Sequence, residues 1–393
     1  MQEQSAKIHY LDGIRGLAAC NVLLTHFIVA FYPALYTGKS IQAHLTGDIE
    51  VSLAKSLWTI FYAGNISITI LFVLSAYVLS FNFFKHQDAS LATAGAYRRY
   101  LRLEIPVLFA LLLSWFCMHF GLYYNAEAAA ITHSEWWLGS YYQFEPSLWG
   151  AVKQALWESF APGGSVSYNP VLWTMNFEML GSFTVFGFLA LFGKSRSRFL
   201  VYLVLLLVFV KSYYLSFVIG MLFSDLHYSA WGQPVREYLW KRQWLSWLFI
   251  IVGLLIGSYF ADGRNVWCQW LDIPALKDWG IDLYAFYHII GGSLVLLGCF
   301  YNRLAQNILG RRVFQFLGRI AFSLYLLHFL LLCSLGSFLF LLAYQQGLSY
   351  GLSVLVSVAV TTPVILLAAY GMTVYVDEPA MRWTKALQKK YLY

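Results

Sequence analysis

Long apolar runs recur along the whole chain, and short segments between them hold most of the charged residues. A helix that crosses a bilayer needs about 20 mostly apolar residues. Ten runs approach this length and predict an all-α integral membrane protein with one domain over residues 1–393. The predicted spans are 12–34, 64–84, 103–124, 171–192, 198–211, 213–227, 244–260, 280–300, 321–344 and 350–376.

The pair 198–211 and 213–227 is the least regular, because both runs are short and only Lys211 and Ser212 separate them. One long kinked helix there would give nine spans and place the C-terminus on the other side of the membrane. Cytoplasmic segments of membrane proteins carry an excess of Lys and Arg. With a cytoplasmic N-terminus, ten spans put most of the 26 basic residues inside, whereas merging the pair would move the clusters at 236–242 and 303–319 outside. We therefore predict ten spans with both termini cytoplasmic.

Composition agrees with a membrane protein and excludes several other classes. The chain is 60% hydrophobic and 11% charged, whereas soluble domains have about 45–50% apolar and about 25% charged residues. The net charge of +7 follows from the predicted topology, so it does not indicate nucleic-acid binding. Five cysteines without paired spacing indicate neither a disulfide framework nor a metal site. The motifs of serine hydrolases, P-loop enzymes and zinc proteases are absent from the sequence.

An aromatic-rich segment follows the third predicted span, over residues 125–170. Aromatic side chains gather where a membrane meets water, so we expect one or two interfacial helices there. Stacking on a sugar ring is the alternative interpretation, and the interfacial one is favoured. The residues concerned are Trp136, Trp137, Tyr141, Tyr142, Trp149 and Trp157.

Ionisable side chains inside the spans are the main functional candidates, because each costs about 2.5–3.5 kcal/mol at the centre of a bilayer. Arg15 and His26 are eleven residues apart, which places them on nearly the same helical face and about 16 Å apart along the axis. Arg15 would meet phosphate at the cytoplasmic surface, and His26 could exchange a proton near mid-membrane. A snorkelling arginine and a packing histidine are the alternative. The other intramembrane candidates are His119, Glu178, His288 and His328.

Two of the basic residues before the third span share a helical face. Arg99 and Arg102 are three residues apart, and two guanidinium groups at this spacing can hold a phosphate together. Anchoring at the cytoplasmic surface is the alternative role. Glu178 is expected to orient a catalytic histidine, to bind a hydroxylated acceptor, or only to pair with His288. His119 has no neighbouring motif, which favours a packing role.

The order of these residues resembles acyltransferase family 3, the multi-span membrane enzymes that acylate lipopolysaccharide O-antigen, exopolysaccharides and related surface glycans. The family opens with an Arg, ten residues and a His, and Arg15 and His26 match this pattern. After the serine of the second span, here Ser75, the family usually has a glycine, whereas this chain has Ala76. The other matching segments are Leu71 to Ser75, Arg99 to Arg102, Trp173 to Glu178, Ser323 to His328, and Glu378 with Pro379.

The resemblance implies an acyl-CoA donor, acetyl-CoA by default, and no metal. The acceptor would be a hydroxyl of a cell-surface carbohydrate or glycolipid, and the location the bacterial inner membrane. Arg15, Arg99 and Arg102 would bind the phosphates of coenzyme A. His26 would act as general base or carry the acyl group transiently, and Glu178 would orient His26 or the acceptor.

Five further site candidates follow from the resemblance: Asp12, Ser75, Trp173, Tyr325 and His328. A proton-coupled transporter or flippase is the alternative function, because buried histidine and glutamate residues also serve such carriers. The oligomeric state and the identity of the acceptor are left open.

Overall fold

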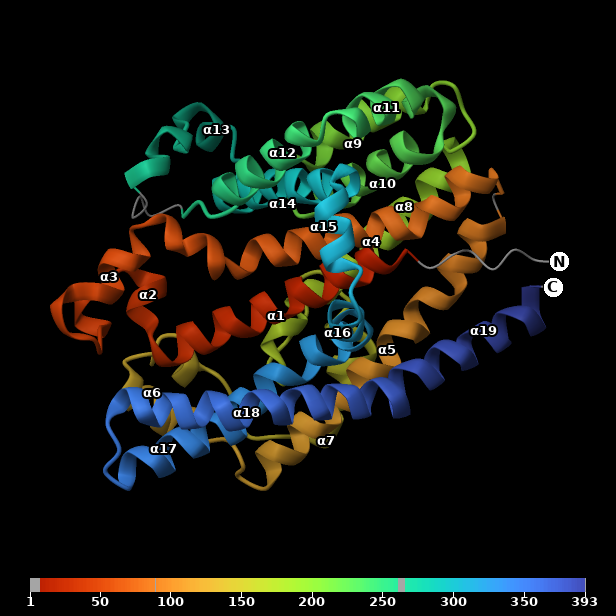
Figure 1. Ribbon diagram of the computed structural model, residues 1–393. Helices are drawn as coiled ribbons and strands as arrows, with labels where there is room; N and C mark the ends of the chain where they lie inside the picture. The colour runs from red at the N-terminus through yellow and green to blue at the C-terminus, as the bar shows by residue number, and fades with distance from the viewer. Residues whose placement is uncertain (1–7, 89, 261–265, 393) are drawn as a thin grey trace.

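The computed structural model describes residues 8–88, 90–260 and 266–392. Within these residues the secondary structure is helical, without a β-strand, as the apolar pattern predicts (Figure 1). In the part of the chain that the structure describes, seven helices are long and apolar enough to cross a membrane. They are α1 (His9–Phe31), α4 (Gly64–His86), α5 (Ser90–His119), Pro170–Phe192 with α8 (Trp173–Phe192), α14 (Leu283–Tyr301), Arg312–Gln345 with α16 (Arg312–Leu331) and α17 (Ser337–Gln345), and Tyr350–Lys390 with α18 (Tyr350–Met372) and most of α19 (Glu378–Leu392).

The three remaining predicted spans are also helical but shorter. They are α9 (Arg198–Phe209), α10 (Tyr214–Tyr228) and α12 (Gln243–Ile256), with lengths of about 18–22 Å against a hydrocarbon thickness of about 30 Å. The segments α9 and α10 are separate helices that pack together, so they do not form the single kinked helix considered above. The helix α11 (Gln233–Lys241) meets α12 at a bend of 91°. By length, the described residues have seven or eight spans, and the count of ten stays a prediction.

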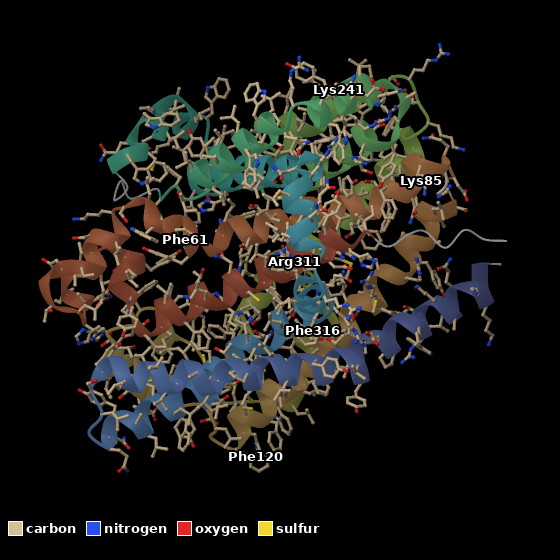
Figure 2. The ribbon with its side chains drawn as sticks, viewed as in Figure 1. Phe61, Lys85, Phe120, Lys241, Arg311 and Phe316 are labelled. Carbon is tan, nitrogen blue, oxygen red and sulfur yellow. The ribbon has the colours of Figure 1, made fainter. Side chains whose placement is uncertain are left out.

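Most long helices run side by side between two ends of the bundle (Figure 1). The start of α1 and the end of α19 lie at the same end, together with α11. Figure 2 shows Lys85 and Lys241 at this end, which we call the basic end. The short helices α2 (Pro33–Thr37), α3 (Ile49–Ala54), α6 (Asn125–Thr132) and α13 (Pro274–Asp278) lie at the opposite end. A cytoplasmic basic end stays a prediction.

The segment 125–170 enters the bundle instead of lying only along its surface. Leu138 is fully buried, and the Ser134 hydroxyl donates to the carbonyl of Val29 in α1 at 2.8 Å. Trp149 and Trp157 in the same segment are 70% and 71% exposed. The expected interfacial role therefore fits these two tryptophans, but it does not describe the buried part of the segment.

The helices α1 and α16 make the most extensive helix contact in the structure. A Cβ atom on Gly16 would lie 2.5 Å from the backbone nitrogen of Gly318, and one on Gly318 would lie 2.0 Å from the carbonyl oxygen of Asp12. Only glycine allows two backbones to approach so closely, which is how membrane helices pack in the absence of a hydrophobic driving force between them. The two helices run in the same direction from the basic end (Figure 1).

We predict that Gly16→Ala destabilises the protein by about 1–3 kcal/mol, because the added methyl group forces α1 and α16 apart. Gly187→Ala is the matched control, since a Cβ there meets nothing within 4 Å. The control should be neutral or stabilising by up to about 1 kcal/mol. Thermal unfolding of both variants in detergent micelles measures the difference, and equal unfolding temperatures would show that this contact does not limit stability.

Candidate active site

Two histidines from α1 and α16 lie in direct contact inside the bundle. The Nδ1 atom of His26 is 2.7 Å from the Nε2 atom of His328, and the two rings stack with centroids 4.9 Å apart. His26 is ten residues beyond Gly16, and His328 is ten residues beyond Gly318. Parallel helices in contact at the glycines therefore bring the two rings together about 15 Å further along the axis.

Hydrogen-bond partners fix the tautomer of each neutral ring. The Nδ1 atom of His328 is 3.1 Å from the carbonyl oxygen of Leu324, which can only accept, so this nitrogen carries the proton. The Nε2 atom of His328 then has no proton and accepts from Nδ1–H of His26. It follows that Nε2 of His26 carries a lone pair that neither bond uses, as a general base or a nucleophile requires.

His26 lines a cavity of about 100 Å³, whereas His328 lies behind it and is 1% exposed. The ring of Trp137 approaches the His26 ring to 5.2 Å and that of Phe329 to 5.7 Å, measured between centroids. The remaining lining residues come from α1, α4, α16 and the segment 141–173: Val22, Ile68, Tyr141, Pro170, Val171, Trp173 and Tyr325. His26 therefore lines a small chamber with mainly aromatic walls.

Two of the candidates from the family resemblance, Trp173 and Tyr325, line this chamber. The Tyr325 hydroxyl is 2.5 Å from the Val171 carbonyl, to which it donates, and 2.9 Å from the Thr174 hydroxyl. Tyr325 thus ties the start of α8 to α16. The sequence does not predict Trp137 as a site residue, because several Trp and Tyr residues surround it and nothing in the pattern distinguishes one of them from the others.

A buried ion pair links three further helices. Arg99 of α5 pairs with Glu178 of α8, and its Nε–H donates to the Ser182 hydroxyl at 2.8 Å. The Ser75 hydroxyl of α4 donates to Glu178 and accepts from Arg99 at 3.3 Å. Arg99 is only 7% exposed. The guanidinium is therefore enclosed by groups that satisfy it, and Ser75 is part of this enclosure.

This ion pair bears on two expectations from the sequence. Arg99 and Arg102 interact electrostatically but differ in exposure, because Arg99 is buried beside Glu178 while Arg102 is exposed. A joint phosphate site of the two arginines stays a prediction. Neither His26 nor His288 is bonded to Glu178 among the described residues. The Nδ1–H of His288 instead donates to the carbonyl of Tyr284 at 2.6 Å. Glu178 balances the charge of Arg99, which a carboxylate in a bilayer requires.

On the side of the basic end, Arg102 is exposed and Arg15 is half-buried. Arg15 pairs with Asp12 at 3.1 Å and interacts electrostatically with Arg102 and Glu178. Arg102 also interacts with Asp377, which lies at the end of the π-helical turn Thr373–Asp377. The like charges of the two guanidinium groups favour an anion between them. We call Arg15 and Arg102 the arginine entrance.

Two other candidates lie apart from the chamber. Glu378 accepts a hydrogen bond from Nε–H of Arg319 at 2.7 Å. His119 ends α5, where it is exposed and stacks on Trp115 with centroids 5.3 Å apart. The expected packing histidine is therefore a surface residue. Among the described residues, no group of three His, Cys, Asp or Glu side chains could hold a metal ion.

Comparisons with known proteins agree with the family resemblance. A family model described as an acyltransferase domain matches residues 8–370. Acyltransferase R4 of Phoma sp. and acyltransferase clz18 of Cochliobolus lunatus are each 23% identical, over 97% of this chain and 95% of each relative. O-acetyltransferase PaAT-1 of Phomopsis amygdali is 22% identical over 83% of this chain and 72% of its own length. No solved structure matches significantly. The chain therefore belongs to acyltransferase family 3 and is a membrane-bound O-acyltransferase.

Proposed function

We propose that the enzyme transfers an acetyl group from acetyl-CoA, bound from the cytoplasm, to a hydroxyl of a cell-surface carbohydrate or glycolipid. The observation that carries the proposal is the His26–His328 pair, which leaves a lone pair of His26 for the chamber. The name of the O-acetyltransferase relative supports acetyl as the transferred group. A transporter is no longer the competing function, since the family is one of acyltransferases.

The chemical step uses His26 as general base. Nε2 of His26 takes the proton of the acceptor hydroxyl while the hydroxyl oxygen attacks the carbonyl carbon of the thioester. The carbon–sulfur bond then breaks, the acyl group stays on the acceptor as an ester, and the proton passes from Nε2 to the leaving thiolate. Meanwhile His328 holds Nδ1–H of His26 at 2.7 Å, which stabilises the transient positive charge.

The donor reaches His26 from the arginine entrance. Arg15 and His26 share one face of α1 and are about 16 Å apart along its axis. Phosphates of coenzyme A bound between Arg15 and Arg102 would leave the pantetheine arm to extend along this face toward the chamber. Glu178 interacts electrostatically with Arg15 at the entrance and with Tyr325 at the chamber, so it lies beside this path. Its charge there is balanced by Arg99.

The acceptor enters from the opposite end of the bundle. Trp137 belongs to the segment that enters the bundle next to α6, and it contacts His26 directly. Aromatic rings pack against the C–H faces of sugars, and the chamber offers Trp137, Tyr141 and Trp173. We assign the protein to the bacterial inner membrane on the strength of the resemblance to surface-glycan acyltransferases. The relatives named above come from fungi, so membership of the family is not limited to bacteria.

His26→Ala should lower the rate of acetyl transfer by more than about 100-fold, because the step loses its base. The measurement is transfer of labelled acetyl from acetyl-CoA in membranes that contain equal amounts of each variant. His119→Ala is the matched control, since this histidine is exposed at the end of α5, and it should retain wild-type activity. Wild-type rates for His26→Ala in correctly folded protein would refute the assignment. Label retained on the wild-type enzyme without acceptor would indicate a transient acyl-histidine instead of a general base.

His328 is expected to act as a positioning residue, because it bonds to His26 and does not line the chamber. His328→Leu removes the acceptor for Nδ1–H of His26 and should reduce kcat by about 10- to 100-fold, with the KM for acetyl-CoA unchanged. His328→Gln restores an acceptor oxygen near the position of Nε2 and should recover part of the loss. Steady-state kinetics on both variants provide the test. Equal kcat values for the Leu and Gln variants would show that His328 only fills space.

Arg102→Ala and Arg99→Ala should fail in different ways. Arg102 is exposed, so its loss should raise the KM for acetyl-CoA several-fold without changing the unfolding temperature. Loss of Arg99 leaves Glu178 unpaired in the bundle and should cost about 3–5 kcal/mol of stability. Adding Glu178→Gln to Arg99→Ala should recover part of that stability. A stable Arg99→Ala protein with a raised KM would restore Arg99 to the phosphate site.

A further inference from the structure

A second cavity, of about 440 Å³, lies at the basic end, where α1, α10, α11, α14 and α15 (Arg303–Leu309) meet. Its volume falls in the range of small-molecule sites. No residue that lines it also lines the His26 chamber. Tyr10 lines this cavity sixteen residues before His26, which puts the two side chains about 24 Å apart along α1 and on nearly opposite faces. The proposed acyl-CoA path therefore does not account for this cavity, which we call the interfacial cavity.

The residues that line the interfacial cavity combine aromatic rings with one charge of each sign, and the guanidinium of Arg303 lies over one of these rings, 5.2 Å from the centroid of Trp240. The rings are those of Tyr10, His227, Trp240, Phe300 and Tyr301. Aromatic faces attract cations, and cages of such rings recognise substituted ammonium groups. This arrangement favours a ligand with a positively charged nitrogen.

Arg236 and Glu237 supply the two charges. One guanidinium nitrogen of Arg236 donates to the carbonyls of Leu226 at 2.9 Å and Ser229 at 2.8 Å, which fixes the group in place. Glu237 is exposed and accepts a hydrogen bond from Gln233 at 2.9 Å. A fixed guanidinium suits a phosphate, and a carboxylate beside aromatic rings suits an ammonium group.

His227, which lines the interfacial cavity, has a buried polar atom without a hydrogen-bond partner among the described residues. This atom is Nδ1 of the ring. Such a group costs free energy unless something binds to it. A ligand with a primary ammonium group could donate a hydrogen bond to this nitrogen, whereas a trimethylammonium group has no N–H and could not.

The position of the cavity indicates where its ligand comes from. The short helix α11 forms one wall and meets α12 at 91°, so it lies across the end of the bundle. Exposed aromatic side chains surround it, including Trp231, Tyr238 and Trp244. Trp and Tyr concentrate at the depth of lipid headgroups. The cavity therefore opens at the headgroup layer, on the side that the basic residues predict to be cytoplasmic.

We propose that the interfacial cavity binds the headgroup of a zwitterionic phospholipid with an ethanolamine group. Its ammonium group lies among the aromatic rings beside Glu237, and its phosphate contacts Arg236. A purely anionic headgroup has no positive group to place beside the Glu237 carboxylate, so this carboxylate would repel it. The bound lipid stabilises the start of α1, because Tyr10 lines the cavity at that point.

The test uses the full chain, purified in a nonionic detergent, with short-chain lipids as probes. Dihexanoyl phosphatidylethanolamine should raise the unfolding temperature in a saturable way, as a ligand of the folded state does. Dihexanoyl phosphatidylcholine should have a weaker effect, because its trimethylammonium group cannot donate a hydrogen bond to His227. Dihexanoyl phosphatidylglycerol and ADP should not raise the unfolding temperature. Glu237→Gln and Trp240→Leu should each weaken the apparent affinity at least about tenfold. Trp244→Leu is the matched control, because this exposed tryptophan does not line the cavity.

Three outcomes would overturn the proposal. An equal shift with phosphatidylglycerol would show nonspecific lipid solvation, and a shift with ADP that Trp240→Leu abolishes would show a nucleotide site. Unchanged affinity in both cavity variants would also exclude the assigned residues. Acetyl transfer by the two variants, measured in parallel, separates this proposal from the catalytic one, because neither residue belongs to the His26 chamber.

Discussion

The close backbone contact between α1 and α16 is the constraint on which the candidate active site depends. Gly16 and Gly318 let the two backbones approach to distances that any side chain would prevent. Because the helices run parallel, the same contact sets the register of the residues ten positions further along. The 2.7 Å bond between His26 and His328 is therefore a consequence of helix packing at the basic end. Packing of this kind is the main source of affinity between helices in lipid.

Pairing of buried charges determines which basic residues remain for a ligand. Arg99 is matched by Glu178, and Arg198 holds Asp225 with two bonds of 2.7 and 3.2 Å. Buried charges need such partners, since an isolated ion in the bundle would be far too costly. Arg102 stays exposed at the surface. The same rule explains why the sequence motif of two arginines divides into one structural and one accessible residue.

The sequence predicts the helical membrane fold well, because a run of about 20 apolar residues has few alternatives in a bilayer. The sequence predicts the lengths of α9, α10 and α12 less well. Their apolar runs continue past the helix ends into turns and bends, which hydropathy alone does not distinguish from helix. The common face of Arg15 and His26 follows from helical periodicity within one segment. Periodicity within one segment does not predict the partner of Glu178. Glu178 pairs with Arg99 and not with His288 because of how α4, α5 and α8 pack. Trp137 and Trp149 have the same composition around them, and only their burial separates them.

Two π-helical turns lie at the two ends of the proposed donor path. One, Leu332–Gly336, begins four residues after His328, and the other, Thr373–Asp377, ends at the residue that interacts with Arg102. A π-turn inserts a residue into the helix and weakens the regular bonding around it, and such turns are frequent at functional sites. They lie on the continuations of α16 and α18, which pack against each other. Side chains can therefore adjust locally at the entrance and at the chamber, while the glycine contact between α1 and α16 keeps the helices themselves in place.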